Sequence, residues 1–236
     1  MNLIIYNLFN IFNNIEYIHQ NYNIYSKGFG FRVYEILFSI FFSYLFDIIL
    51  YLFGDKNKKR RWYFLHAIIN TVVCIFTFFD FVEVILDPLS GFEGSRISLP
   101  LMITISLHLF HILTCFKNLT FVDWMHHLIS CLFVGIIGEV YVHGPIINYF
   151  LFFLCGLPGG IDYYLLTFNK YGIIKRITEK KINVNLNMWI RVPGVLFGCN
   201  TCYFYLLYNN RLKYNIYVSF LIIFLNMYNC IYFATL

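Results

Sequence analysis

Residues 62–86 read WYFLHAIINTVVCIFTFFDFVEVIL, and the seven residues before them read DKNKKRR. Because a helix rises about 1.5 Å per residue, roughly 20 mainly apolar residues cross the ~30 Å hydrocarbon core of a bilayer. A dense basic run directly before such a stretch is typical of the cytoplasmic end of a membrane span. This stretch therefore predicts a transmembrane helix that starts at a cytoplasmic loop.

The whole chain has the same apolar character. Of its 236 residues, 60% are hydrophobic, 22% are aromatic and 12% are charged, and the mean hydropathy is +0.67. A soluble domain carries about 25% charged residues, and half of that cannot cover a water-facing surface. The composition excludes a soluble globular, disordered, collagen-like or coiled-coil protein and predicts an all-α polytopic membrane protein. The net charge of +5 comes from loops without a basic stripe, so we expect no nucleic-acid partner.

Seven apolar runs are long enough to cross a bilayer. They cover residues 33–53, 62–86, 97–115, 121–142, 145–168, 186–208 and 215–236. We expect residues 33–236 to form one domain of about seven transmembrane helices. Residues 1–32 are apolar but rich in Asn, and we expect them to form an interfacial segment.

Loop charge orients these predicted spans. The basic loop 55–61 and the loop after the fifth span, with Lys170, Lys175, Arg176, Lys180 and Lys181, emerge on the same side. The positive-inside rule makes that side cytoplasmic. The N-terminus would then be lumenal and the C-terminus cytoplasmic.

Ionisable side chains within the spans gather in the cytoplasmic half of the membrane. Each costs about 2.5–3.5 kcal/mol at the centre of a membrane helix, so such residues are usually functional. Alternation of the spans places nine of them there: Asp47, His66, His108, His111, Asp123, His126, His127, Asp162 and Arg191. Asp80, Glu83 and Glu139 instead mark lumenal helix ends.

Helical spacing groups several of these residues. His108 and His111 are three residues apart and share a face, and Asp123 is within one turn of both His126 and His127. The short connection 116–120 makes the two helices antiparallel neighbours and brings both histidine pairs to one depth. Imidazoles beside a carboxylate suit general acid–base or nucleophilic chemistry near neutral pH.

Candidate roles follow from this grouping. We assign His126, His127, His108, His111 and Asp123 as catalytic residues, and Asp162, Arg191, His66 and Asp47 as substrate-binding residues. No metal and no bound cofactor are assigned. Glycine and proline at 156–160 and 193–194 predict broken helices that line a cavity, with Asp162 and Arg191 as partners across the break.

The ordered motifs resemble the TRAM-LAG1-CLN8 (TLC) family of membrane proteins. They are the segment Trp62–Ala67 after a basic loop, the pair His126-His127 opening a later span, Glu139 before Pro145 and Asn148, and Arg191 in the next helix. The resemblance covers roughly residues 38–208. It implies six helices bundled around a lipid-accessible tunnel plus one additional helix, an endoplasmic-reticulum membrane, and membrane lipids as partners.

The resemblance also implies chemistry. Ceramide synthases of that family use a histidine pair to acylate sphingoid bases from acyl-CoA, which carries over to His126 and His127 and makes acyl-CoA the expected co-substrate. Residues 128–139 lack the paired-aspartate segment that follows in those enzymes, so the sequence does not assign ceramide synthesis. Other members are lipid sensors or lipid-handling factors without catalysis.

Four hypotheses therefore stay open at this point. The first is acyl transfer at the histidine cluster, and the second is a non-catalytic lipid sensor or trafficking factor of the same fold. A fatty-acid elongase-like enzyme is a weaker alternative, because its contiguous HxxHH motif is here divided between two spans. A proton-coupled transporter is weaker still, because the chain has no internal repeat. The sequence leaves open whether the chain forms a homo-oligomer.

Overall fold

The computed structural model describes residues 29–92, 96–141, 144–208 and 216–234. Its longer helices are α2 (Phe29–Leu52), α3 (Lys58–Leu86), α4 (Leu99–Cys115), α5 (Phe121–His127), α8 (Leu157–Lys170), α9 (Arg176–Leu186), α10 (Val192–Tyr208) and α11 (Ile216–Ala234). Short helices α6 (Gly138–Tyr141) and α7 (Ile146–Leu151), 3-10 turns η1 (Ser90–Phe92) and η2 (Phe116–Asn118), and π segments η3 (Leu128–Ile137), η4 (Phe152–Gly156) and η5 (Asn187–Arg191) complete it. The described residues contain no β-strand, which confirms the all-α prediction.

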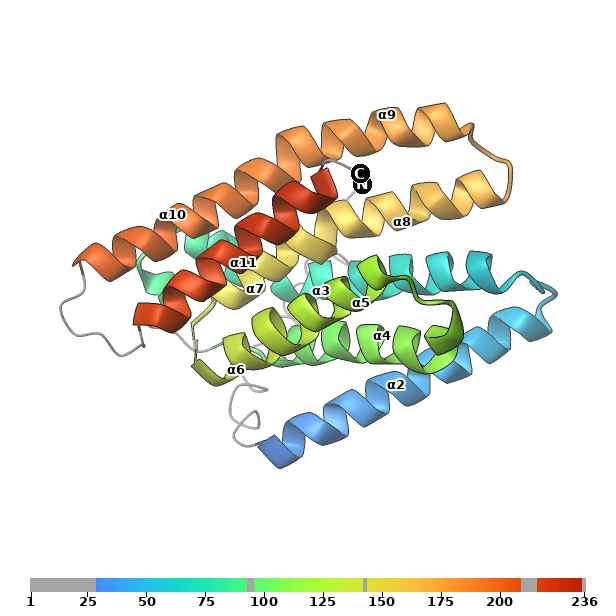
Figure 1. The fold of residues 1–236 in the computed structure, drawn as a ribbon, viewed down its shortest axis with the longest axis horizontal. Helices are drawn as coiled ribbons and strands as arrows, with labels where there is room; N and C mark the ends of the chain where they lie inside the picture. Colours follow the sequence, from blue (N-terminus) through green and yellow to red (C-terminus); the bar gives the residue numbers. More distant parts are fainter. Residues whose placement is uncertain (1–28, 93–95, 142–143, 209–215, 235–236) are drawn as a thin grey trace, which may run out of the picture.

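Helical segments lie in each of the seven predicted ranges and run side by side along the long axis of the molecule (Figure 1). Among the described residues, four helices are long and apolar enough to cross a membrane: Arg32–Leu52, Lys58–Leu86, Leu99–Asn118 and Ile146–Lys170. Many large apolar side chains are exposed, including Phe38 and Phe224 at 64% and 65%. An outer surface of this kind suits lipid rather than water. The predicted interfacial segment 1–32 falls almost entirely outside the described residues.

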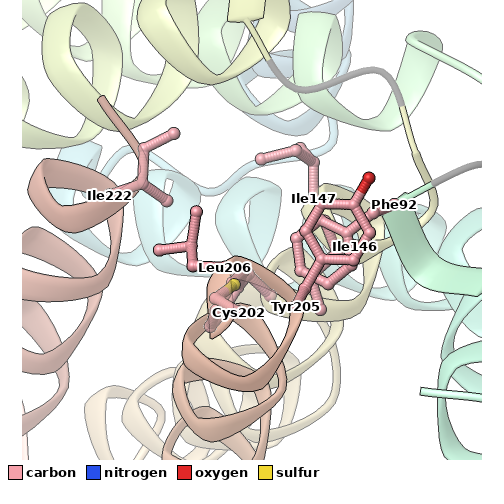
Figure 2. Close-up of a pocket in the computed structure, with 8 residues that line it drawn as sticks. Phe92, Ile146, Ile147, Cys202, Tyr205, Leu206 and Ile222 are labelled. Atoms are coloured by element: carbon pink, nitrogen blue, oxygen red, sulfur yellow. The ribbon is translucent and has the colours of Figure 1, made fainter. Parts of the chain in front are cut away.

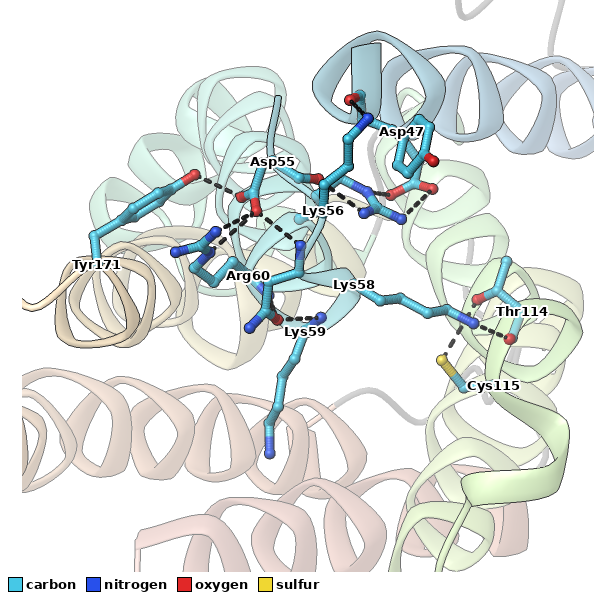
Figure 3. A network of polar contacts seen from close by, with 12 residues as sticks. Asp47, Asp55, Lys56, Lys58, Lys59, Arg60, Thr114, Cys115 and Tyr171 are labelled. Atoms are coloured by element: carbon cyan, nitrogen blue, oxygen red, sulfur yellow. Dashed lines mark hydrogen bonds and ion pairs between the residues drawn. The ribbon is translucent and has the colours of Figure 1, made fainter. Parts of the chain in front are cut away.

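The two basic segments meet at one end of the bundle, as predicted. The phenolic hydroxyl of Tyr171, directly after α8, donates to Asp55 Oδ2 in the α2–α3 turn at 2.7 Å (Figure 3). Asp55 Oδ1 also accepts from Arg60 Nε and Nη2 at 3.0 and 2.8 Å. Lys58 Nζ donates to the carbonyl of Thr114 near the end of α4 at 2.6 Å. These side chains tie three helix ends together.

One expectation about the second basic segment is wrong. Arg176, Lys180 and Lys181 are helical, because α9 begins at Arg176 and continues through η5 into α10. Only residues 171–175 form the turn, in which Gly172 adopts a φ of 75°. Glu179 lies in the first turn of α9, where an acidic side chain interacts favourably with the helix dipole and stabilises the helix.

The predicted helix breaks are π turns within continuous helices. η4 ends two residues before Pro158, and η5 ends two residues before Pro193. Proline has no N–H and its ring collides with the carbonyl four residues earlier, so the wider π turn makes room for it. The glycines beside Pro158 bring α8 close to α3: a Cβ at Gly159 would lie 2.9 Å from Asn70 Nδ2.

The apolar core lies toward the other end of the bundle, between α3, α4, α7 and α10. Tyr149 and Val195 are fully buried there, and the Tyr149 hydroxyl donates to the carbonyl of Gly194 at 2.8 Å. A void of about 20 Å³ between α7, α10 and α11 is walled by aliphatic and aromatic side chains such as Ile147, Tyr205 and Ile222 (Figure 2). This volume holds no more than about one water molecule, so the void is a packing feature rather than a binding site.

Buried polar residues join the helices at the end of the bundle opposite the basic segments. Glu139 accepts from Ser98 Oγ at 2.7 Å and forms ion pairs with Arg96 and with Arg32, the latter at 2.7 Å. The Asn148 amide donates to the carboxylate of Asp80 and to the carbonyl of Ile97. Glu139 and Asn148, two of the residues that carry the family resemblance, therefore hold helix ends together, far along the bundle from the histidines.

Replacing Gly194 by alanine tests the packing of α10 against η4. A Cβ there would lie 2.2 Å from Cδ1 of Phe153, whose ring is held by Phe81 and Phe152. We expect Gly194→Ala to lower the free energy of unfolding by about 1–3 kcal/mol, as overpacking does, measured by thermal unfolding in detergent. Gly160→Ala is the control, because the nearest atom to its Cβ would lie at 3.6 Å. Equal losses in both variants would contradict this packing.

The Asp55–Tyr171 contact predicts a pH dependence of stability. Burial raises the pKa of Asp55, but hydrogen bonds from Tyr171 and Arg60 outweigh it and hold the pKa below its ordinary value. The hydrogen bond to Asp55 raises the pKa of Tyr171. The stabilisation by Asp55 is present above its unfolded-state pKa and is lost as the pH falls through the lower folded value. The stabilisation by Tyr171 is present below its unfolded-state pKa and is lost as the pH rises through the higher folded value.

We therefore expect Tyr171→Phe to be less stable than the wild type by about 0.5–1 kcal/mol between roughly pH 5 and pH 9. The difference should shrink as the pH falls below about 4. Thermal unfolding across this pH range measures it. Tyr203→Phe, at a half-exposed tyrosine of α10, is the control and should match the wild type throughout. A pH-independent deficit in Tyr171→Phe would contradict the ionised contact.

Candidate functional site

A cavity of about 250 Å³ lies between α3, α4, η3, η4 and α8, and residues of α5, α7, α9, η5 and α11 complete its wall. Its apolar wall includes Leu101, Leu107, Val134, Leu151 and Leu154. Its polar wall includes His66, Asn70, His108, His126, Asp162, Lys180, Asn183, Arg191 and Asn229. The cavity is therefore amphipathic, with histidine, carboxylate, amide and guanidinium groups facing an aliphatic surface.

All three π segments in the described part of the chain border this cavity. Ser130 and Val134 come from η3, Leu154 and Cys155 from η4, and Arg191 from η5. A π turn shifts the side chains that follow it around the helix axis, and such turns are frequent at functional sites. The glycine and proline positions that favoured a cavity in the sequence do adjoin one, although the helices stay continuous.

Four histidines pack together beside the cavity. His108 Nδ1 lies 3.0 Å from His127 Nδ1, and His127 Nε2 lies 3.1 Å from His111 Nδ1. The ring of His126 lies 4.9 Å from that of His108, and its Nδ1 is 3.3 Å from Ser130 Oγ. The prediction that both histidine pairs lie at one depth is confirmed. His126 lines the cavity, whereas His127 is buried behind it against His108 and His111.

Aromatic rings hold two of the histidines in place. Trp62 stacks on His111 with ring centroids 4.1 Å apart, and it meets His66 edge to face at 5.1 Å. The ring of Tyr163 stacks on that of His66, with ring centroids 3.6 Å apart and an interplanar angle of 5°. Both rings are large and have few rotamers, so they fix the orientations of the imidazoles.

Four buried polar atoms of cavity-lining residues have no hydrogen-bond partner. They are His66 Nδ1, Asn70 Nδ2, Asp162 Oδ1 and Arg191 Nε. Leaving a buried donor or acceptor without a partner costs about 1–3 kcal/mol, and such groups are rare in folded proteins. Four of the ten such atoms in the described residues therefore face one cavity, where a polar ligand or water could complete them.

The predicted pairing of Asp162 with Arg191 is wrong. Both residues line the cavity, but no ion pair joins them within 4.0 Å. Arg191 Nη1 instead donates to Asn187 Oδ1, four residues earlier on the same helix. The local hydrogen bond holds the guanidinium, so both charged groups remain directed at the shared cavity.

Two further candidates have structural roles. Asp47 forms an ion pair with Arg61 at 2.8 Å, which joins α2 to α3. Asp123 forms a capping box at the start of α5: its Oδ2 accepts from the backbone and hydroxyl of Thr120 at 2.8 and 2.7 Å. Neither residue lines the cavity. Asp123 acts on the histidines by fixing the helix that carries them.

Sequence reasoning missed several cavity residues. Asn70, Asn183 and Asn229 lie in the wall, together with Lys180 and Tyr163. Amides within apolar segments were the available signal, but Asn is so frequent in this chain that single positions carried little weight. Lys180 was assigned to a loop, and only the helical continuation of α9 brings it to the cavity.

No family model, curated protein or solved structure matches the chain. The functional argument therefore depends on the geometry of the site itself.

Neighbouring histidines give a matched test of this geometry. His127→Phe removes the partner of both His108 Nδ1 and His111 Nδ1, and a buried unpaired group costs about 1–3 kcal/mol. His126→Phe removes the contact with Ser130 at the cavity wall and leaves the His108–His127–His111 chain intact. We expect His127→Phe to lower the free energy of unfolding by more than His126→Phe, measured by thermal unfolding in the same detergent. A larger loss for His126→Phe would contradict the arrangement.

Proposed function

We propose that the protein is an enzyme of about seven transmembrane helices that binds a lipid in this cavity and transfers or modifies its acyl chain at the histidine cluster. The observation that carries the proposal is the set of four unpartnered polar atoms in the wall of an amphipathic cavity. A lipid brings both kinds of surface: a polar end to complete these atoms and methylenes to cover the leucines.

The reaction we propose is acyl transfer from acyl-CoA. The thioester C–S bond breaks and an amide or ester bond forms; an imidazole takes the proton of the attacking amine or hydroxyl and returns it to the departing thiolate, which leaves as the thiol of coenzyme A. His126 and His108 are the imidazoles in the cavity wall. Exposed Lys56, Lys59 and Lys117 at the nearby basic end suit the phosphates of coenzyme A or of anionic headgroups.

Topology and membrane are part of the same proposal. The basic end would face the cytoplasm, with a lumenal N-terminus and a cytoplasmic C-terminus, following the positive-inside rule. The order of Trp62, His126-His127, Glu139 and Arg191 resembles the TLC family. That resemblance supports a bundle of six helices around a lipid-accessible tunnel, and an endoplasmic-reticulum or related membrane.

A non-catalytic lipid sensor is the second candidate. His108, His127 and His111 already hydrogen-bond to one another, so they need no substrate to satisfy them. The four unpartnered atoms are explained by a bound ligand without any reaction. In this alternative the cavity holds a headgroup and the cluster stabilises the wall.

Lipidomics of cells that express matched variants tests the proposal. We expect a lipid species in wild-type cells that falls at least tenfold with His126→Ala or Asp162→Asn, at equal membrane expression. Phe224→Leu, at a 65% exposed residue of α11, is the control and should retain the product.

The lipids that co-purify with each protein separate the two candidates. A product lost in His126→Ala while the variant still binds lipid supports an enzyme. Identical lipidomes, with a lipid bound by the wild type and lost from Asp162→Asn, support the sensor. Identical lipidomes with no bound lipid in any variant would overturn both.

A further inference from the structure

Three of the histidines are placed so that one atom of each can meet at a point. One ring nitrogen from each of His108, His126 and His127 lies within 4.8 Å of the others. The closest pair, Nδ1 of His108 and Nδ1 of His127, is separated by 3.0 Å. Two imidazoles bound to one tetrahedral zinc ion have their nitrogens roughly 3.3 Å apart, because each Zn–N bond is about 2.0–2.1 Å. The His108–His127 pair needs to open by only about 0.3 Å, and nitrogens as far apart as 4.8 Å would have to approach by about 1.5 Å, for all three to reach one ion.

The second ring nitrogens of His127 and His126 have the partners that metal-bound histidines require. With Nδ1 of His127 on the ion, its Nε2–H donates to His111 Nδ1, 3.1 Å away, and Trp62 stacks on His111. With Nε2 of His126 on the ion, its Nδ1–H donates to Ser130 Oγ at 3.3 Å. Such outer contacts select the tautomer and orient the ring of a metal ligand.

The backbone holds the three ligands rigidly. His108 lies on α4, and His126 and His127 lie on α5. The short connection through η2 and the Thr120–Asp123 capping box fix the start of α5 beside the end of α4. A site on two clamped helices is already organised before a metal enters.

We propose that His108, His126 and His127 bind one divalent first-row transition-metal ion, with zinc as the ion that three neutral imidazoles suit best. Three protein ligands leave a coordination position open, and His108 and His126 line the cavity, so that position is available to a cavity ligand. There the ion would polarise a carbonyl or phosphoryl oxygen. While they hold the ion, His108 and His126 would act as ligands in place of the proton-accepting role that the metal-free acyl transfer assigns to them. The inference does not require lipid turnover, since it concerns metal binding alone.

Metal analysis of the full-length protein, purified in detergent with a tag that contains no histidine, tests the site. We expect the wild type to hold about one equivalent of metal after reconstitution with Zn²⁺ and desalting. His108→Asn and His127→Asn should lose it, and His111→Gln should weaken Zn²⁺ binding by about 10- to 100-fold in competition with a chromophoric chelator. His66→Asn is the control, because His66 lines the same cavity outside the cluster, and it should keep the metal.

A ligand exchange separates loss of metal from loss of folding. His108→Cys replaces one ligand by another, so it should still bind Co²⁺ and add a thiolate-to-cobalt absorption band that the wild type lacks. Less than about one tenth of an equivalent of any first-row metal in the wild type would overturn the proposal. Equal metal loss in His66→Asn and His108→Asn would overturn it as well. Either result leaves the lipidomic test untouched, because that test measures product and bound lipid.

Discussion

Histidines in an apolar bundle must find polar partners within the protein, because lipid offers none. The contact between the Nδ1 atoms of His108 and His127 meets this requirement by joining α4 to α5, and His111 extends it to the second nitrogen of His127. The turn between the two helices, the capping box of α5 and the stacking of Trp62 on His111 all serve to keep these rings in register. This contact sets His108 and His126 side by side in the cavity wall.

The two ends of the bundle use polar residues differently. At the end with Glu139 and Asp80, the buried charged groups are bonded to neighbouring side chains and join helix ends, although the amide oxygen of Asn148, which bonds Asp80 through its nitrogen, lacks a partner. Around the cavity, Asp162 and Arg191 share a space without pairing, and both keep a buried atom without a partner. Charged groups that are bonded to one another contribute to folding. Charged groups that share a cavity without bonding to each other are available to a ligand. The second arrangement is the one expected of a binding site.

The π turns link the helix path to the site. Pro158 and Pro193 each follow a π segment, so a residue type that normally breaks a helix here only widens one turn. The helices remain continuous, which keeps backbone groups bonded within the bundle. The same turns place Cys155 and Arg191 in the cavity wall. A device that accommodates proline in an apolar bundle therefore also shapes the cavity.

Much of the architecture was predictable from hydropathy and helical spacing. The all-α class, the positions of the helices, the shared end of the basic segments and the common depth of the histidine pairs depend on apolar run length and on residues three or four apart, which are local properties. What local properties could not decide was which side chains meet. Asp123 accepts a hydrogen bond from Thr120 at the start of its own helix, and Asp47 forms an ion pair with Arg61. Arg191 donates to Asn187 on its own helix rather than pairing with Asp162.

The sequence by itself determined an all-helical chain, with helices apolar and long enough to cross a membrane and with its two histidine pairs at one depth. Only the tertiary structure decided that one ring nitrogen from each of three histidines lies within 4.8 Å of the others, that Lys180 and three asparagines line the cavity, and that Asp162 and Arg191 face it without an ion pair between them. The physical reason is that periodicity fixes the face of a helix a residue occupies. The rotation of each helix about its axis, and its shift along the bundle relative to its neighbours, are set by packing among all the helices.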